Sequence, residues 1–169
     1  SFSDQVHLTE PQAAIDAALR MVEDRADILD LGGESTRPGA EPVSAAEELQ
    51  RLLPVIEGLK DCGRPLSIDT RKPEVMREVL AAGADMINDI AGFAEAGAVE
   101  AVAASACGLC VMHMKGEPQT MQQAPAYDDV VSEVEEFLLG RVEALTAAGV
   151  SPARIVIDPG IGFGKDTRH

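Results

Sequence analysis

The sequence predicts an α/β protein with a parallel sheet, and the placement of its polar residues favours a (β/α)8 TIM barrel over an open sheet. Short apolar runs alternate with helical patterns of roughly 10 to 20 residues, and no Asn-Gly or Asp-Gly hairpin turn joins two strand candidates. This alternation indicates parallel strands joined by right-handed crossovers. Polar residues follow strand after strand, as at the catalytic face of a barrel, whereas an open sheet gathers them at one switch point.

The expected elements follow one another along the chain, with boundaries set by capping residues, prolines and glycines. The first helix has Thr9 as its expected N-cap, two residues before Pro11, and the second carries an apolar stripe of Leu49, Leu52, Leu53 and Ile56. Helices are expected at 10–24, 44–59, 73–82, 94–104 and 128–148, and strands at 27–31, 65–69, 85–90, 109–114 and 154–158.

Length, charge and cysteine content limit the possible functions. A chain of 169 residues with 46% apolar content can bury the core of one domain. The net charge of -15 argues against nucleic acid or an anionic membrane surface as a partner, so an anionic substrate needs local Arg or Lys side chains or a metal. No apolar run reaches the ~18 residues of a membrane span, and no secretory signal opens the chain. Three cysteines without a disulfide-like layout favour the cytoplasm, and Cys107-Gly-Leu-Cys110 is interpreted as structural.

Polar side chains stand where each predicted strand ends. Side chains of these types serve in catalysis or ligand binding. A carboxylate after a strand often only caps the next helix, however, and Asp69 or Asp89 could have that role alone. The groups are Asp30 with 34–37, 69–71, Asn88 with Asp89, 113–115 and 158–160.

The loop after the first strand is unusually rich in functional groups. Gly32 and Gly33 free the backbone, and the following Glu34, Ser35, Thr36 and Arg37 bring a carboxylate, two hydroxyls and a cation into four positions. A simple connector needs none of these, so we interpret the loop as part of a ligand site.

The glycine-rich tail at 160–164 matches neither a P-loop nor a dinucleotide fingerprint. Pro159 stands where a P-loop has its first glycine, Asp166 replaces the Ser or Thr, and the spacing is Gly-x-Gly-x-Gly. We interpret it as an active-site loop that presents Phe163 and Lys165, with a plain terminal tail as the alternative.

Five motifs in the order and spacing of one family occur along the chain: GGESTRPG at 32–39, SIDTRKPEV at 67–75, INDI at 87–90, VMHMKGEPQTMQ at 111–122 and DPGIGFGK at 158–165. Together they resemble dihydropteroate synthase, a pterin-binding enzyme family. The resemblance implies a (β/α)8 barrel in the cytoplasm that condenses 6-hydroxymethyl-7,8-dihydropterin diphosphate with 4-aminobenzoate, with Mg2+ as cofactor. The products are 7,8-dihydropteroate and diphosphate in folate biosynthesis, and the family is the target of sulfonamides.

The resemblance also assigns roles to individual positions. It implies a pterin pocket, a loop that closes over diphosphate and 4-aminobenzoate, and apolar walls around the aminobenzoate ring. Asp69 would stabilise a pterin cation, and Arg37 with Mg2+ would stabilise the leaving diphosphate. The pocket residues are Asp69, Asn88, Met112 and Asp158, the loop residues are Thr36 and Arg37, and the wall residues are Phe2, Pro38 and Phe163.

The resemblance predicts that this chain is the central part of a longer enzyme. Residues 1–169 would form one partial barrel domain, truncated at both ends and holding strands two to six, because a complete barrel has typically ~250 residues. The family's magnesium-contacting asparagine would precede Ser1, and the full-length protein is expected to be a homodimer. Arg71 places a large cation beside Asp69, with an orientation that the sequence leaves open.

Two alternatives remain at this stage. Pterin-binding methyltransferases that serve corrinoid proteins share the barrel and similar Asp and Asn contacts, but the Ser-Thr-Arg-Pro-Gly loop suits diphosphate and aminobenzoate better. The other alternative is a fragment that binds a pterin without chemistry.

Overall fold

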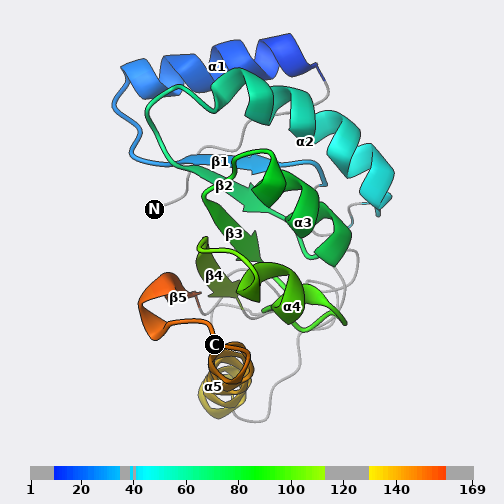
Figure 1. Cartoon of the computed structure of the whole chain (residues 1–169), viewed down its shortest axis with the longest axis vertical. Helices are drawn as coiled ribbons and strands as arrows, with labels where there is room; N and C mark the ends of the chain where they lie inside the picture. The colour runs from blue at the N-terminus through cyan, green and yellow to red at the C-terminus, as the bar shows by residue number, and fades with distance from the viewer. Residues whose placement is uncertain (1–9, 35–38, 40, 113–129, 159–169) are drawn as a thin grey trace.

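The computed structural model describes residues 10–34, 39, 41–112 and 130–158, with side chains from 133 to 157 in the last range. Helices and strands alternate through these ranges (Figure 1). The helices are α1 (Pro11–Glu23), α2 (Ala45–Leu59), α3 (Pro73–Ala81), α4 (Ala98–Ala103), α5 (Val130–Ala147) and the short 3-10 helix η1 (Pro152–Arg154). The strands are β1 (Leu29–Gly32), β2 (Leu66–Asp69), β3 (Met86–Asp89), β4 (Gly108–Met112) and β5 (Ile155–Asp158).

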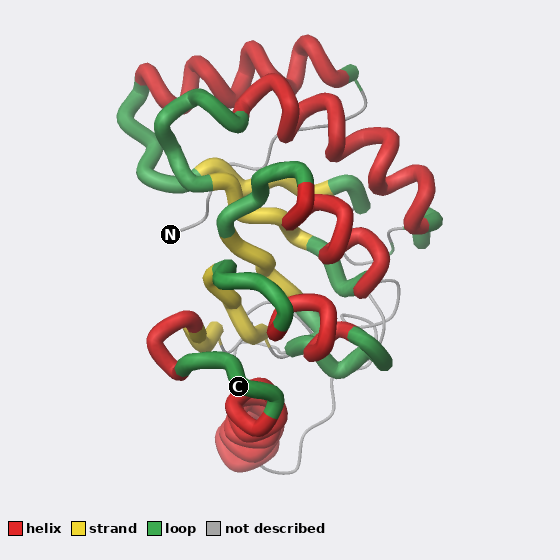
Figure 2. Tube along the Cα trace, in the orientation of Figure 1, coloured by secondary structure: helices red, strands yellow, loops and turns green. Residues whose placement is uncertain are grey.

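The five strands form one sheet in the order β1-β2-β3-β4-β5, and every neighbouring pair is parallel. Figure 2 shows the strands following one another with helices along the outside. Each helix from α1 to α5 packs against the next one in the chain. The predicted alternation and the parallel sheet are therefore confirmed.

The register separates an apolar face from a polar face. Leu31, Ile68, Ile87 and Leu109 are register partners across β1 to β4, and each is completely buried. These four belong to one core cluster with the inner sides of the helices. The next row, one residue along each strand, points to the opposite face, because side chains alternate along a strand. That row contains Gly32, Asp69, Asn88 and Cys110.

Local sequence explains where the helices begin. Ser44 caps α2 by accepting a hydrogen bond from the Glu47 backbone N–H at 3.2 Å, and Pro73 opens α3. The predicted Thr9 cap is wrong: Pro11 takes the first helical position, so Glu10 occupies the N-cap and makes no side-chain cap bond.

Two other predictions need correction in detail. The fourth helix begins at Ala98 rather than at 94, because Gly97 adopts a left-handed backbone conformation that a helix interior does not accommodate. The apolar stripe of α2 is rotated, since Leu52 and Ile56 are buried but Leu49 and Leu53 are only half-buried. The buried face of α2 consists of Glu48, Leu52, Val55, Ile56 and Leu59.

None of the helices in the described ranges has the length and apolar character needed to cross a bilayer.

Arg154 connects the start of β5 to α4 and to the residue before β4, and its removal should lower stability. Its Nε donates to the Cys107 carbonyl at 2.7 Å and its Nη2 to the Val102 carbonyl at 3.0 Å, beside the end of α4. Because these are hydrogen bonds from a charged donor, we expect Arg154→Met to reduce the free energy of unfolding by about 2 kcal/mol. Urea denaturation measures this change. Arg64→Met, an exposed arginine, is the control, and equal losses in both variants would contradict the assignment.

Candidate functional site

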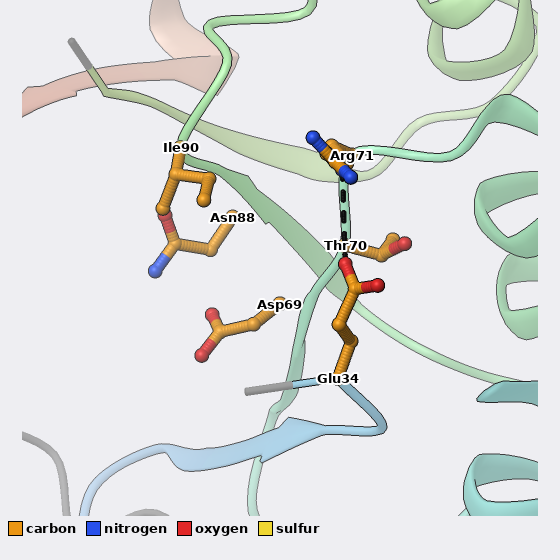
Figure 3. A pocket seen from close by; sticks show the side chains of 6 residues that line it. All are labelled: Glu34, Asp69, Thr70, Arg71, Asn88 and Ile90. Atoms are coloured by element: carbon orange, nitrogen blue, oxygen red, sulfur yellow. Dashed lines mark ion pairs between the residues drawn. The ribbon is translucent and has the colours of Figure 1, made fainter. Parts of the chain in front are cut away.

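A pocket lies at the carboxyl ends of β1, β2 and β3, where strand-end polar groups were predicted. It is a small recess that is partly open to solvent. Figure 3 shows the side chains around it, with those of Asp69 and Asn88 pointing the same way. The described lining residues are Glu34, Asp69, Thr70, Arg71, Asn88 and Ile90.

The structure brings together the predicted pterin-pocket residues that it describes. Asp69 and Asn88 are direct register partners, and Met112 is the register partner of Asp158. Since Asn88 pairs with Cys110 and Met112 lies two residues further along β4, Met112 shares the face of Asp69 and Asn88. The side chain of Asp158 and the predicted residues Phe2, Thr36, Arg37, Pro38 and Phe163 lie outside the described part of the chain.

Asn88 offers a hydrogen-bond acceptor to a ligand. Its side-chain oxygen is buried and accepts no hydrogen bond from any described residue. Buried polar atoms are almost always paired in proteins, so an acceptor of this kind in a pocket is suited to a donor on a bound molecule. The Thr70 backbone N–H donates to the Asn88 carbonyl at 3.1 Å, which fixes the end of β2 beside the end of β3.

Asp89 does not cap the next helix, which the sequence left open as its role, because the N-cap of α4 is Gly97 and no side chain caps that helix. It is completely buried on the core side, and its carboxylate accepts the backbone N–H of Ala91 at 2.8 Å and of Phe93 at 2.9 Å. Burial raises the pKa of Asp89 to about 7, although these two hydrogen bonds act in the opposite direction. Asp89 therefore shapes the turn after β3.

Beside the pocket lie three charged residues, Glu34, Glu48 and Lys72, which together with the hydroxyl of Thr70 form what we call the charged cluster. The Lys72 ammonium donates to Glu34 at 3.1 Å and also to Glu48, and the Thr70 hydroxyl donates to Glu48 at 3.0 Å. Glu34 also accepts the Val43 backbone N–H at 2.6 Å. The cluster thus connects the residues after β1, the first turn of α2 and the turn after β2.

Burial and pairing act against each other in the charged cluster. Burial raises the pKa of Glu48, and the opposing hydrogen bonds from Lys72 and Thr70 do not cancel this effect. Burial alone would lower the pKa of Lys72, but its bonds to Glu48 and Glu34 outweigh burial and raise that pKa. Lys72 therefore remains protonated between the two carboxylates.

Sequence reasoning missed Glu48 and Lys72, although the chain held a signal for the first. Glu48 stands four residues before Leu52 and seven before Val55, so it occupies a core position of an amphipathic helix. A carboxylate at such a position needs a buried partner. The partner, Lys72, comes from a different β/α unit, and the helix pattern cannot name it.

Gly33 is required for the close packing of this region. A Cβ at this position would meet the backbone Cα and carbonyl oxygen of Glu48 at 3.1 Å each. The Arg51 guanidinium donates to the Gly33 carbonyl at 2.8 Å on the same side. The glycine predicted to allow backbone freedom therefore allows the chain to pass directly against α2.

The resemblance implies Mg2+ as a cofactor. Within the described ranges no three His, Cys, Asp or Glu side chains lie close enough to hold a metal ion together. No step of the reaction is therefore assigned to a metal held by the described residues.

Polar pocket residues at the carboxyl ends of consecutive parallel strands define a barrel-type ligand-binding protein. A family model for pterin binding enzymes matches residues 1–169, so the chain belongs to the pterin-binding enzyme family. The "Dihydropteroate synthase" of Escherichia coli (strain K12) is 45% identical over 170 residues, covering 100% of this chain and 60% of that protein.

Solved structures of dihydropteroate synthases are also similar to this chain. A Burkholderia cenocepacia dihydropteroate synthase complexed with 7,8-dihydropteroate is 54% identical, with a TM-score of 0.88 over 96% of this chain and 59% of that one. A Yersinia pestis dihydropteroate synthase with a sulfonamide drug is 44% identical, with a TM-score of 0.92 over 100% of this chain and 62% of that one. The predicted fold class is confirmed, and the chain spans about 60% of the length of the curated relative.

The raised pKa of Asp89 predicts how stability depends on pH. Asp89 takes up its proton at about 7 in the folded protein instead of at 3.8, so the folded state binds more protons between these values. The Asp89 contribution should therefore lower stability by on the order of 4 kcal/mol as pH rises from about 4 to 7, and stay constant above 7. Asp89→Asn should remove this dependence while losing one hydrogen bond at every pH. Urea denaturation of both proteins across this range is the measurement, and a pH-independent difference would contradict it.

The charged cluster predicts a non-additive pair of substitutions. Lys72→Met leaves Glu48 buried without its cation, and we expect the free energy of unfolding to fall by about 3 kcal/mol. Adding Glu48→Gln should recover part of that loss, because the buried charge is gone. The control is Lys60→Met, since Lys60 forms only an exposed pair with Glu57 and its loss should leave stability unchanged. A double variant less stable than Lys72→Met would count against this account.

Proposed function

We propose that this chain is part of a dihydropteroate synthase, which condenses 6-hydroxymethyl-7,8-dihydropterin diphosphate with 4-aminobenzoate to give 7,8-dihydropteroate and diphosphate. One observation carries the proposal: Asp69 and Asn88 are register partners at one pocket, in a chain whose similar proteins are named dihydropteroate synthase. The names of those proteins support this function over the corrinoid methyltransferase alternative.

The pocket suits the chemistry of a pterin ring. The aminopyrimidine edge of a pterin presents N–H donors beside ring-nitrogen acceptors, and a carboxylate beside a carboxamide can satisfy both kinds. In the proposal Asp69 and Asn88 bind this edge, Asp158 adds a second carboxylate, and Met112 packs beside the ring. A site built to hydrogen-bond such an edge rejects analogues that lack it, because its buried polar groups would stay unpaired.

The proposed reaction breaks the bond between the pterin methylene carbon and the diphosphate oxygen, and the electron pair leaves with diphosphate. The amine of 4-aminobenzoate then donates its lone pair to that carbon and releases a proton to solvent. Asp69 stabilises the positive charge on the pterin in between, and Arg37 stabilises the negative charge on the departing diphosphate. Thr36 acts with Arg37, and Phe2, Pro38 and Phe163 enclose the aminobenzoate ring.

The remaining parts of the proposal follow from the resemblance. Residues 1–169 would be one part of a single barrel domain in a cytoplasmic homodimer that sulfonamides inhibit. Small-molecule substrates are the proposed partners, with no nucleic acid and no membrane. Mg2+ would be the cofactor, with ligands beyond the described residues.

Substitution of Asp69 tests the role of its charge in the intact protein. Asp69→Asn keeps the size of the side chain and removes one negative charge beside the proposed cation. We therefore expect turnover to fall by about 100-fold or more, with a much smaller loss of affinity for a neutral pterin. Arg37→Ala should slow diphosphate release while leaving pterin affinity nearly unchanged.

Diphosphate release and calorimetric titration with a pterin analogue measure the two effects separately. Asp61→Asn serves as the control, because this exposed aspartate lies in the turn after α2. Normal turnover by Asp69→Asn, or loss of pterin binding by Arg37→Ala, would sink the proposal.

A further inference from the structure

The pocket contains a cation that the predicted pterin contacts do not use. Arg71 lies two residues after Asp69, in the turn between β2 and α3, and lines the same pocket as Asp69 and Asn88 (Figure 3). Its side chain is 16% exposed, so it is partly desolvated but reachable from the pocket. The orientation that the sequence left open is therefore toward the site.

Two carboxylates lie near the Arg71 side chain. Its Nε lies 3.7 Å from Glu34 and 3.7 Å from Glu95. Both negative charges attract the guanidinium and keep it at the pocket wall.

Glu34 does not depend on Arg71 for its own position. It also accepts the Lys72 ammonium at 3.1 Å and the Val43 backbone N–H at 2.6 Å. Glu95 is 42% exposed and can be solvated by water. Glu34 therefore keeps two partners when the Arg71 charge is removed.

Because acidic side chains line the pocket, an anionic ligand needs a nearby cation in order to bind there. Of the described lining residues, Glu34 and Asp69 are acidic and Arg71 alone is basic. The whole chain carries a net charge of -15, so an anion must be held by a local positive group. Both proposed substrates carry an anionic end, one a diphosphate and the other a carboxylate.

We propose that Arg71 is an additional substrate-binding residue that contacts an oxyanion of a bound substrate. The inference rests on the proposed function, and the chemistry is shared by the diphosphate of the pterin substrate and the carboxylate of 4-aminobenzoate. The planar guanidinium offers paired donors to two oxygens of either group. Glu34 and Glu95 position the side chain, and Asp69 and Asn88 bind the ring.

The test compares Arg71→Met, Arg71→Lys and the control Arg77→Met in the intact protein. Arg77 is an exposed arginine on α3, so its replacement removes the same charge away from the pocket. Calorimetric titrations use three probes: a neutral pterin, inorganic diphosphate, and 4-aminobenzoate with pterin present. Thermal unfolding of each variant is measured in parallel.

We expect Arg71→Met to weaken one anionic probe about tenfold, with neutral pterin affinity within twofold of wild type. The probe that is weakened identifies the oxyanion. Arg71→Lys should be intermediate, because it keeps the charge and loses the planar pair of donors. Added salt should reduce the difference between wild type and Arg71→Met.

The inference is overturned if both anions bind Arg71→Met as they bind wild type, or if neutral pterin is weakened as much as the anions. Failure of the proposed function gives a different result, since the wild-type protein would then form no dihydropteroate. A wild-type protein that turns over normally, with an Arg71→Met variant of equal affinity for both anions, contradicts only the role of Arg71.

Discussion

The parallel register between neighbouring strands is the constraint on which the site depends. Because β2 and β3 pair residue for residue, the packing of Ile68 against Ile87 in the core places Asp69 beside Asn88 on the opposite face. A shift of one residue in either strand would move a polar side chain into the core and an isoleucine into the pocket. The hydrophobic energy of the core thus fixes the geometry of the polar site.

The charged cluster is a second constraint, and it connects parts of the chain that the sheet alone does not join. Lys72 follows β2, Glu34 follows β1 and Glu48 lies in the first turn of α2. A buried ion pair contributes little net stability compared with apolar packing, but a wrong arrangement that separates the charges is strongly unfavourable. We infer that the cluster holds Glu34 in one position relative to Asp69. The cluster can keep two carboxylates mostly buried because Lys72 pairs with both of them and Arg71 lies near Glu34.

The order of the elements and the face of the sheet that carries the pocket could be predicted from the sequence, because both depend on local sequence patterns. Alternating apolar runs gave the five strands, and strand-end polarity pointed to Asp69 and Asn88 on one edge. The sequence did not predict the roles of Glu48 and Lys72 or the orientation of Arg71. Their contacts join separate β/α units, and local periodicity carries no information about such contacts. The rotated face of α2 has the same origin, since Glu48 occupies a core position that a hydrophobic stripe omits. The later start of α4 follows from the positive φ of Gly97, its N-cap, which the alanine-rich pattern did not reveal.

The central claim is that Asp69 and Asn88 together bind the aminopyrimidine edge of a pterin. A crystal structure of the intact protein with 7,8-dihydropteroate tests it most directly. The account predicts ring nitrogens within roughly 2.7–3.2 Å of both side chains, with the aminobenzoate part extending out of the pocket. A pterin bound at another place, or a ring in the pocket that contacts neither Asp69 nor Asn88, would contradict it.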